Sequence, residues 1–199
     1  MAPTMEEIED FSRIAGDPAL DLVNTVSWRL NDERRIEHLT GYRDVLRWAA
    51  QVGLLAIDER ATLVRLSEAD ERSAASELEQ VRALREAFYE AVYLDGSTES
   101  IGREYADATR VGALSAADAG WRWELPIDLA LPRRRIAIAM VALLTGGGLD
   151  RLGQCADADC GWVYLDSSPR HNRRWCVAAD CGNRNRVRDY YARTRASAT

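Results

Sequence analysis

The sequence contains no lysine, so arginine supplies all 26 of its basic residues. It also lacks a long apolar run, because its most hydrophobic stretch, residues 136–144, is far shorter than the ~20 residues that a helix needs to cross a bilayer. The first ten residues are acidic and have no apolar core, which excludes a secretory signal. These absences predict a cytoplasmic protein without membrane segments, in which thiols are kept reduced.

Signatures of catalysis are missing as well. His38 has no cluster of partner residues, and no Ser-His-Asp set, open metal site or pair of catalytic carboxylates can be assigned. Three consecutive glycines, residues 146–148, lack the preceding strand and the following Lys-Ser/Thr pair that a phosphate-binding loop requires. We interpret them as a helix stop and a hinge. We therefore expect that the protein is not an enzyme.

Length and charge divide the chain into two parts. Its 199 residues, 47% of them hydrophobic, can form one main core and a small appended module. Residues 1–154 hold 18 arginines against 27 acidic residues, whereas the segment from Ser167 onward holds eight arginines against two aspartates. We predict a helical domain over residues 1–148, with a sensing or dimerising role, and a C-terminal module over residues 149–199.

Apolar residues recur at three- and four-residue spacing along most of the first 145 residues, which predicts a mainly α fold. Asp17 and Pro18 can open a first helix that is apolar on several faces as far as Leu30 and therefore belongs in the interior. A small hairpin is predicted where the period changes to alternation, from 111–114 to 121–125. The other predicted helices cover residues 40–52, 58–66, 70–94, 131–145 and a polar piece that ends near residue 109.

Asp21 and Asn24 stand three residues apart on the first predicted helix, so they share one of its otherwise apolar faces. One interpretation is structural, because buried polar pairs usually hydrogen-bond helix ends or loops. The other is that the two residues line a ligand pocket. Their spacing leaves both open.

Four cysteines near the C-terminus follow the pattern Cys155-x4-Cys160-x15-Cys176-x4-Cys181. Two equal pairs can present four thiolates from opposite sides of an ion, as tetrahedral Zn²⁺ requires. A short strand over residues 161–165 and a turn at 166–169 are predicted between the pairs. Because four cysteines fill the coordination shell, we predict one structural Zn²⁺ per chain, which stabilises a β/α module and takes no part in chemistry.

Alternatives to this zinc site are two disulfides, another metal or free thiols. The expected reducing surroundings argue against disulfides. His171 lies between the two pairs and could replace one cysteine, although a solvated loop histidine is the simpler interpretation.

An arginine-rich segment follows the last cysteine. If residues 182–195 form a helix, four side chains fall within about 60° of one another: Arg184, Arg188, Tyr191 and Arg195. This stripe, together with Arg173 and Arg174 in the preceding loop, can contact phosphates. The same arginines can instead pair with the acidic helical domain, and Trp175 can cover the metal core. Both interpretations stay open.

Arg173-Arg-Trp-Cys176, followed by Cys181-Gly-Asn-Arg184, resembles the signature of the CGNR-type zinc-finger proteins, a bacterial family. The similarity extends over residues 152–195. Upstream, Leu20-Asp-Leu-Val-Asn-Thr25 resembles the first-helix motif of the helical domain that precedes this finger in such proteins, a domain described as a stress-induced transcription regulator. One departure is Asp180, which places an acid in the loop of the second cysteine pair.

The resemblance implies a zinc-dependent module that binds nucleic acid, most simply DNA, and a helical domain that responds to a small-molecule effector or forms a homodimer. The residues expected to contact nucleic acid are Arg173, Arg174, Arg184, Arg188 and Arg195. The alternative is a protein-interaction or small-ligand-binding module whose zinc element only stabilises the helical domain. The first function predicts DNA binding that weakens steeply with salt, whereas the second predicts none.

Overall fold

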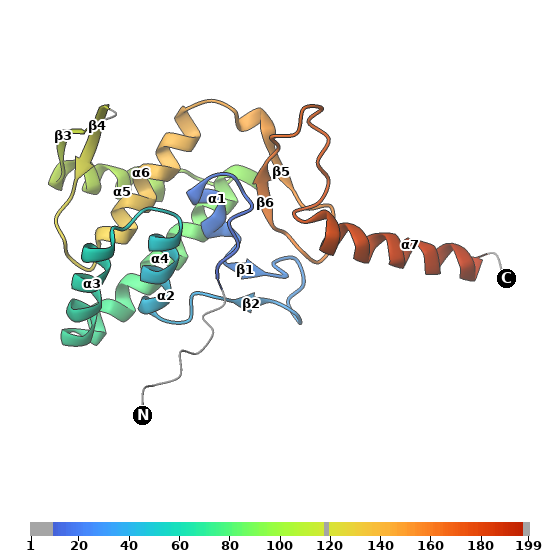
Figure 1. Cartoon of the computed structure of the whole chain (residues 1–199), viewed down its shortest axis with the longest axis horizontal. Helices are drawn as coiled ribbons and strands as arrows, with labels where there is room; N and C mark the ends of the chain where they lie inside the picture. The colour runs from blue at the N-terminus through green and yellow to red at the C-terminus, as the bar shows by residue number, and fades with distance from the viewer. Residues whose placement is uncertain (1–9, 118–119, 197–199) are drawn as a thin grey trace.

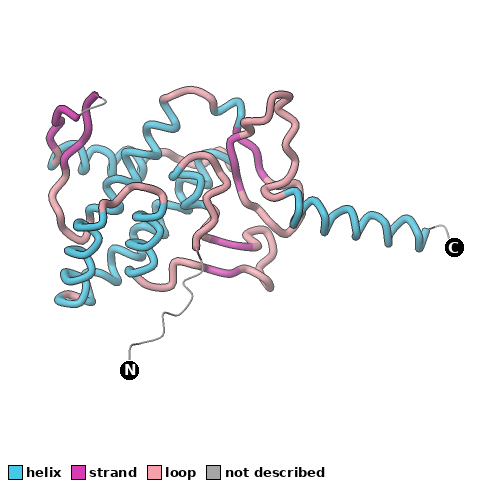
Figure 2. The backbone as a smooth tube through the Cα atoms, in the orientation of Figure 1, coloured by secondary structure: helices cyan, strands magenta, loops and turns pink. Residues whose placement is uncertain are grey.

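The computed structural model describes residues 10–117 and 120–196. Seven α-helices make up most of this part of the chain, and Figure 2 shows them gathered into one body from which the last helix extends. Their bounds are α1 (Pro18–Val23), α2 (Tyr42–Gln51), α3 (Ile57–Ala69), α4 (Glu71–Tyr93), α5 (Glu99–Val111), α6 (Leu131–Thr145) and α7 (Asn183–Ala196). The predicted mainly α fold is confirmed.

The strands of the described residues form three separate antiparallel pairs. These are β1 (Val26–Ser27) with β2 (Ile36–Glu37), β3 (Ala113–Ala117) with β4 (Gly120–Glu124), and β5 (Leu152–Gln154) with β6 (Val163–Leu165). Figure 1 shows the β3–β4 hairpin and α7 at opposite ends of the molecule. The hairpin is confirmed, but its first strand starts two residues later than predicted, because Val111 still belongs to α5.

Helix α1 lies within the core of the helical part. Asp17 caps it by accepting a hydrogen bond from the N–H of Ala19 (2.8 Å). The predicted continuation as far as Leu30 is wrong, because α1 ends at Val23. The next side chain, Asn24, hydrogen-bonds the backbone of β6, and the chain then turns into β1.

Helices α2, α4 and α6 pack with α1 around the main core. Its fully buried side chains include Leu20, Leu22, Val45, Leu46, Trp48, Val81, Phe88, Leu131, Ile136 and Met140. Burying one such large apolar side chain contributes about 1.5–3 kcal/mol. Helix α6 has the predicted bounds, and Gly147 and Gly148 follow it with φ angles of +80° and +88°, so the glycines end the helix as predicted. No helix in the described ranges is long and apolar enough to span a membrane.

The C-terminal module is packed against the helical part through β6. Val163 is completely buried in the main core, and the N–H of Leu165 donates to the carbonyl of Ala15 (2.8 Å). The predicted strand at 161–165 corresponds to β6, whereas its partner β5 was not predicted. Short turns, η1 (Leu149–Arg151) and η2 (Ala178–Gly182), precede β5 and α7. The domain boundary between residues 148 and 149 stays a prediction.

Candidate metal centre and its supporting arginines

The four cysteine side chains converge on one point in the C-terminal module. All four are buried, and their Sγ atoms lie within 4.8 Å of one another. The Sγ atoms of Cys160 and Cys176 are 3.7 Å apart, and those of Cys176 and Cys181 are 3.4 Å apart. A tetrahedral ion with Zn–S bonds of about 2.3 Å would separate its sulfurs by about 3.8 Å. The donor set and its spacing therefore fit a metal ion, and the four cysteines form a metal site.

The protonation states of the four thiols depend on one another. Hydrogen bonds from the thiols of Cys160 and Cys176 lower the pKa of Cys155 and so favour its thiolate form. The pKa values of Cys160 and Cys176 are raised, chiefly by their interaction with Cys155, and burial raises the pKa of Cys181. Four thiolates at this spacing need a cation to neutralise them, which is what a divalent ion supplies.

Both halves of the chain hold the loop of the first cysteine pair. The N–H of Cys155 donates to the carbonyl of Trp162 (2.8 Å), which continues the β5–β6 ladder. Gly161 turns the chain with a φ angle of +71°, and a Cβ atom there would lie only 2.8 Å from the Cβ of Arg29. The N–H of Arg29 in turn donates to the carbonyl of Cys160 (3.0 Å). The metal site is therefore built directly on the helical part.

Asp157, inside the loop of the first pair, receives hydrogen bonds from its own loop and from the start of α7. Only 1% of it is exposed, and its carboxylate accepts from the Nε of Arg184 (3.0 Å) and the Nδ2 of Asn185 (2.7 Å). Burial by itself would raise the pKa of Asp157, but these bonds and one from the N–H of Asp159 hold it below its usual range. Asp157 and Asn185 therefore join the first cysteine loop to the start of α7.

Arg184 also reaches the metal ligands themselves. Its Nη2 donates to the Sγ of Cys181 (2.9 Å), and its Nη1 donates to Asp180 (2.9 Å). A cationic donor at this distance favours the thiolate form of Cys181. Most of the hydrogen-bonding capacity of Arg184 is thus used inside the module.

Trp28 packs between two guanidinium groups beside the metal site. The Cζ atoms of Arg34 and Arg184 lie 3.5 and 4.4 Å from the ring centroid of Trp28. The backbone of Trp28 has a φ angle of +55°, which is strained for a bulky residue. Arg34 also pairs with Asp159 in the first cysteine loop (3.2 Å). These contacts fasten the β1–β2 segment to the metal module.

Two family models match the chain. The model of ABATE, "Putative stress-induced transcription regulator", matches residues 16–147. The chain belongs to the ABATE family. A second model, the CGNR zinc finger, matches residues 151–194, which contain all four cysteines. None of the curated proteins matches the chain. The family resemblance inferred from the sequence is confirmed.

The CGNR finger uses its arginines in two ways. Arg173 lies inward like Arg184: its Nη2 donates to the carbonyl of Cys176 (2.7 Å), and its guanidinium stacks 3.9 Å from the ring centroid of Tyr164. Arg174 and Arg188 are exposed, although Arg174 approaches the ring of Trp175 and Arg188 contacts the side chain of Asn185. Arg195 is exposed near the end of α7. Contact of these five arginines with nucleic acid stays a prediction.

Helix α7 itself agrees with the helix predicted over residues 182–195. Figure 1 shows it extending away from the rest of the molecule, and every side chain from Arg186 to Arg195 is exposed. Arg186 was not among the predicted contact residues, because it lies on the opposite side of the helix from the Arg184–Arg188 stripe. The extended position of α7 makes both sides accessible.

The remaining predicted site residues of this ABATE chain contact the backbone. Asp21 is 6% exposed and accepts a hydrogen bond from the N–H of Ala15 (3.0 Å). Asn24 exchanges two hydrogen bonds with the backbone of Val163 (2.8 and 2.9 Å). Burial raises the pKa of Asp21 to about 6. These contacts are the kind that the structural interpretation predicts. The ligand pocket at Asp21 and Asn24 stays a prediction.

The structure also bears on the alternatives to a site of four cysteine ligands. None of the four cysteines forms a disulfide. His171 is exposed and is not part of the cluster of four thiols. Asp157 and Asn185 were not predicted as site residues, because nothing in their local sequence shows that they will be buried together.

Proposed function

We propose that this ABATE chain is a transcription regulator that binds DNA through the arginines of its exposed C-terminal helix, and that one Zn²⁺ per chain holds this helix in place. The observation that carries the proposal is the position and charge of α7. The segment from Arg186 to Arg195 is exposed throughout and contains four arginines against one acid, Asp189. Arginine-rich surfaces of this kind suit the phosphates of nucleic acids.

The internal contacts of the finger distinguish the arginines that position the module from those that can contact phosphates. Arg173 and Arg184 are held by carbonyls, a carboxylate and a sulfur, so their role is to position the module. We assign direct phosphate contacts to Arg174, Arg186 and Arg188, whose side chains are exposed. An ion held by the four cysteines would cross-link the two cysteine loops, the second of which leads directly into α7.

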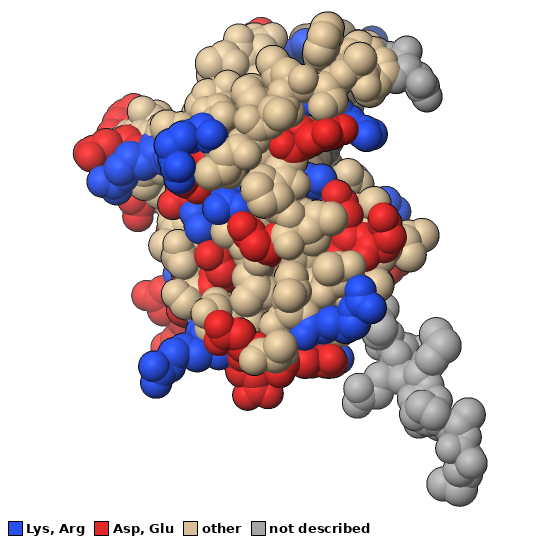
Figure 3. All heavy atoms as spheres, turned by 90° about the vertical axis from the view of Figure 1, so that its left-hand side faces the viewer, with Lys and Arg blue, Asp and Glu red and all other residues tan. Residues whose placement is uncertain are grey.

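The opposite end of the molecule is a poorer candidate for DNA. Figure 3 shows the face on which α3 and the β3–β4 hairpin lie, and basic and acidic side chains are interspersed there. Arg110 on α5 pairs with Asp107 (2.7 Å), and Arg134 pairs with Asp128 (2.8 Å). A surface of paired charges lacks the excess of one sign that attracts a polyanion.

The test compares DNA affinity over a range of salt concentrations. We expect metal analysis to give one zinc per chain, and binding to a labelled duplex to weaken steeply as salt rises. Arg186→Gln/Arg188→Gln should weaken binding and reduce the log–log salt slope by about 0.9 for each phosphate that is no longer neutralised. The matched control is Arg103→Gln/Arg110→Gln, which removes two exposed arginines of α5. Equal weakening in the two double variants would contradict the assignment to α7.

A protein-interaction function is the second candidate. Val187, Tyr190 and Tyr191 are 46%, 61% and 59% exposed on α7 and lie within about 100° of one another around the helix axis. Exposed aromatic residues are common where proteins dock. If the chain binds zinc but no DNA at low salt, this function replaces the first, with the finger acting as a support for the helical part.

The proposal assigns no catalytic role to the protein and places it in the cytoplasm. A homodimer is a further prediction, which sedimentation analysis of the zinc-loaded chain can test.

A further inference from the structure

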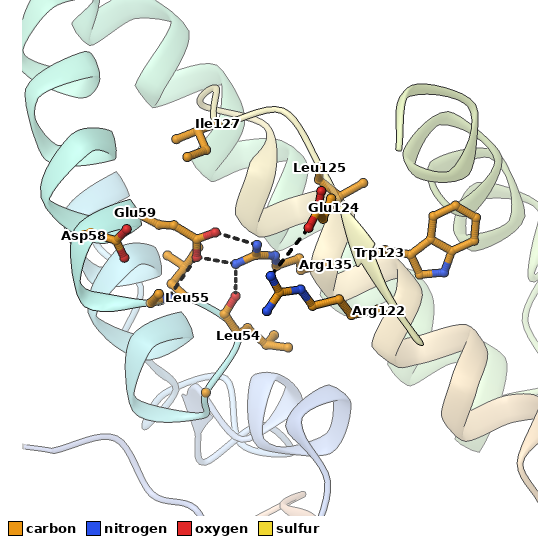
Figure 4. Close-up of a pocket in the computed structure, with 12 residues that line it drawn as sticks. Leu54, Leu55, Asp58, Glu59, Arg122, Trp123, Glu124, Leu125, Ile127 and Arg135 are labelled. Atoms are coloured by element: carbon orange, nitrogen blue, oxygen red, sulfur yellow. Dashed lines mark hydrogen bonds and ion pairs between the residues drawn. The ribbon is translucent and has the colours of Figure 1, made fainter. Parts of the chain in front are cut away.

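A cleft of about 760 Å³ lies at the end of the molecule that carries the β3–β4 hairpin. The turn between α2 and α3, strand β4 and the first part of α6 surround it (Figure 4). Small-molecule sites in proteins usually measure about 300–1,000 Å³, so the cleft has the size of a ligand site. It shares no lining residue with the metal centre.

One side of the cleft is a closed ion pair. Arg135 of α6 donates to both carboxylate oxygens of Glu59 (2.5 and 2.7 Å) and to the carbonyl of Leu54 (2.7 Å). These hydrogen bonds lower the pKa of Glu59, so its carboxylate is ionised near neutral pH. Because both charges are already paired, this side fixes the shape of the cleft and attracts no ion by itself.

The other side carries charges that are poorly paired. Alternation along β4 directs Arg122 and Glu124 toward the cleft and Trp123 to the opposite face of the strand (Figure 4). The contact between Arg122 and Glu124 is long, at 3.5 Å, and their side chains are 68% and 55% exposed. An exposed pair of this kind contributes little and is easily exchanged for other partners.

A third charge lies near the α3 end of the cleft. The carboxylate of Asp58 forms no hydrogen bond or ion pair with any residue in the described part of the chain. Between the charges, Leu54, Leu55 and Ile127 supply an apolar lining. The cleft thus presents a guanidinium, two carboxylates with spare capacity and an apolar surface.

These features select the chemistry of an occupant. A ligand with only a carboxylate can pair with Arg122 but leaves Asp58 and the displaced Glu124 unpaired, and a ligand with only an ammonium group can pair with Asp58 but makes no use of Arg122. A zwitterion satisfies both signs at once, while an apolar part can cover the leucine and isoleucine side chains. We propose that the cleft binds a small zwitterion, an amino acid or short peptide, as the effector of this protein.

The role of the zwitterion as an effector rests on the regulator function proposed above, whereas its binding to the cleft does not. The cleft and α7 lie at opposite ends of the molecule, so a ligand in the cleft does not compete directly with DNA (Figure 1). Ligand binding and DNA binding can therefore be measured separately on one zinc-loaded preparation of the full chain.

The binding test uses calorimetric titration with L-leucine and with L-leucyl-L-leucine, which distinguish an amino acid from a peptide. 4-Methylpentanoate and 3-methylbutylamine are the matched probes, because each keeps one charge of leucine and a similar apolar part. We expect at least one zwitterion to bind about tenfold or more tightly than either matched probe. Arg122→Gln and Asp58→Asn should each weaken that binding by about tenfold, and Arg103→Gln, on α5 outside the cleft, should not change it.

The outcomes separate the two proposals. No binding by either zwitterion at about 10 mM, equal binding of a singly charged probe, or unchanged affinity in Arg122→Gln would overturn the cleft assignment. Because Arg122 is largely exposed, its substitution is compatible with folding, which the unchanged melting temperature of the variant should verify. If the zwitterion binds but the chain has no affinity for DNA, the ligand site stands and the regulator function falls. If DNA binds and its affinity is unchanged by a bound zwitterion, the ligand is not an effector.

Discussion

The Nη2 atom of Arg184 lies 2.9 Å from the Sγ atom of Cys181, three residues earlier in the chain. The same guanidinium donates from Nε to Asp157, which lies in the loop of the first cysteine pair. Arg184 therefore links the two loops that carry the metal ligands and also stacks on Trp28 of the helical part. The last residue of the Cys-Gly-Asn-Arg motif is, by its contacts, a support of the metal site.

Substitution of this arginine should weaken metal binding. Arg184→Ala removes the donor to Cys181 and leaves Asp157 with one fewer partner for its buried charge. Removal of such supporting groups typically lowers metal affinity by about 10–100-fold. Competition with a chromophoric chelator would measure the change, and Arg186→Ala, an exposed position on the same helix, is the control. Similar zinc affinities in the two variants would show that Arg184 does not support the site.

Removal of the metal should destabilise the whole chain as well as the finger. Val163 of β6 is completely buried in the main core and exchanges two hydrogen bonds with Asn24 of the helical part. Disorder of the metal loops would therefore expose core surface outside the module. We expect chelation to lower the melting temperature followed by far-ultraviolet circular dichroism, with recovery when zinc is returned. A helical signal that melts at the same temperature with and without metal would mean that the two parts are not coupled.

The features predicted well from the sequence depend on local patterns. Helix α6 is a single apolar run that ends at three glycines, so its bounds follow from composition alone. The four cysteines have an equal spacing that is recognisable without the fold. The end of α1 could not be predicted in this way, because Asn24 finds its partner Val163 139 residues further along the chain.

The same distinction applies to the arginines of the finger. Their sequence positions predict a basic stripe, but the role of each one depends on which acids and carbonyls the fold brings close. Arg184 meets Asp157, 27 residues earlier, and Arg173 meets the carbonyl of Ile14 in the helical part (3.3 Å). Such partners are invisible to helical periodicity, which places residues around one axis only.

The stacked position of Trp28 gives a third prediction. Trp28→Ala should lower the free energy of unfolding by about 2 kcal/mol, because two guanidinium groups no longer stack on an aromatic ring. Trp28→Gly should be less destabilising than Trp28→Ala, since glycine adopts a φ angle of +55° without strain. Urea denaturation of the zinc-loaded variants would give both values. Trp121→Ala, at a side chain that is 74% exposed, is the control and should change the free energy by less than about 0.5 kcal/mol. The reverse order of the glycine and alanine variants would exclude backbone strain at this position.

The buried carboxyl of Asp21 gives a prediction about pH. Burial raises its pKa in the folded chain to about 6, above the value of 3.8 expected when unfolded. The folded state therefore holds this proton more tightly, so the contribution of Asp21 to the free energy of unfolding is most favourable below pH 4 and is lost as pH rises through 6. Asp21→Asn keeps an acceptor for the N–H of Ala15 but cannot ionise.

We expect Asp21→Asn to be more stable than the unaltered chain at pH 8 by about 1–3 kcal/mol. The advantage should shrink as pH falls from 6 to 4, where the carboxyl becomes protonated in the folded state. Urea denaturation across this pH range would measure the difference in the free energy of unfolding between the two chains. The effects of pH on the metal site and on the other carboxylates largely cancel in this difference. Asp32→Asn, at an exposed position, should show no such trend. A difference that does not vary between pH 4 and 8 would mean that Asp21 titrates alike in the folded and unfolded states, and that its burial is compensated by contacts with the charged form.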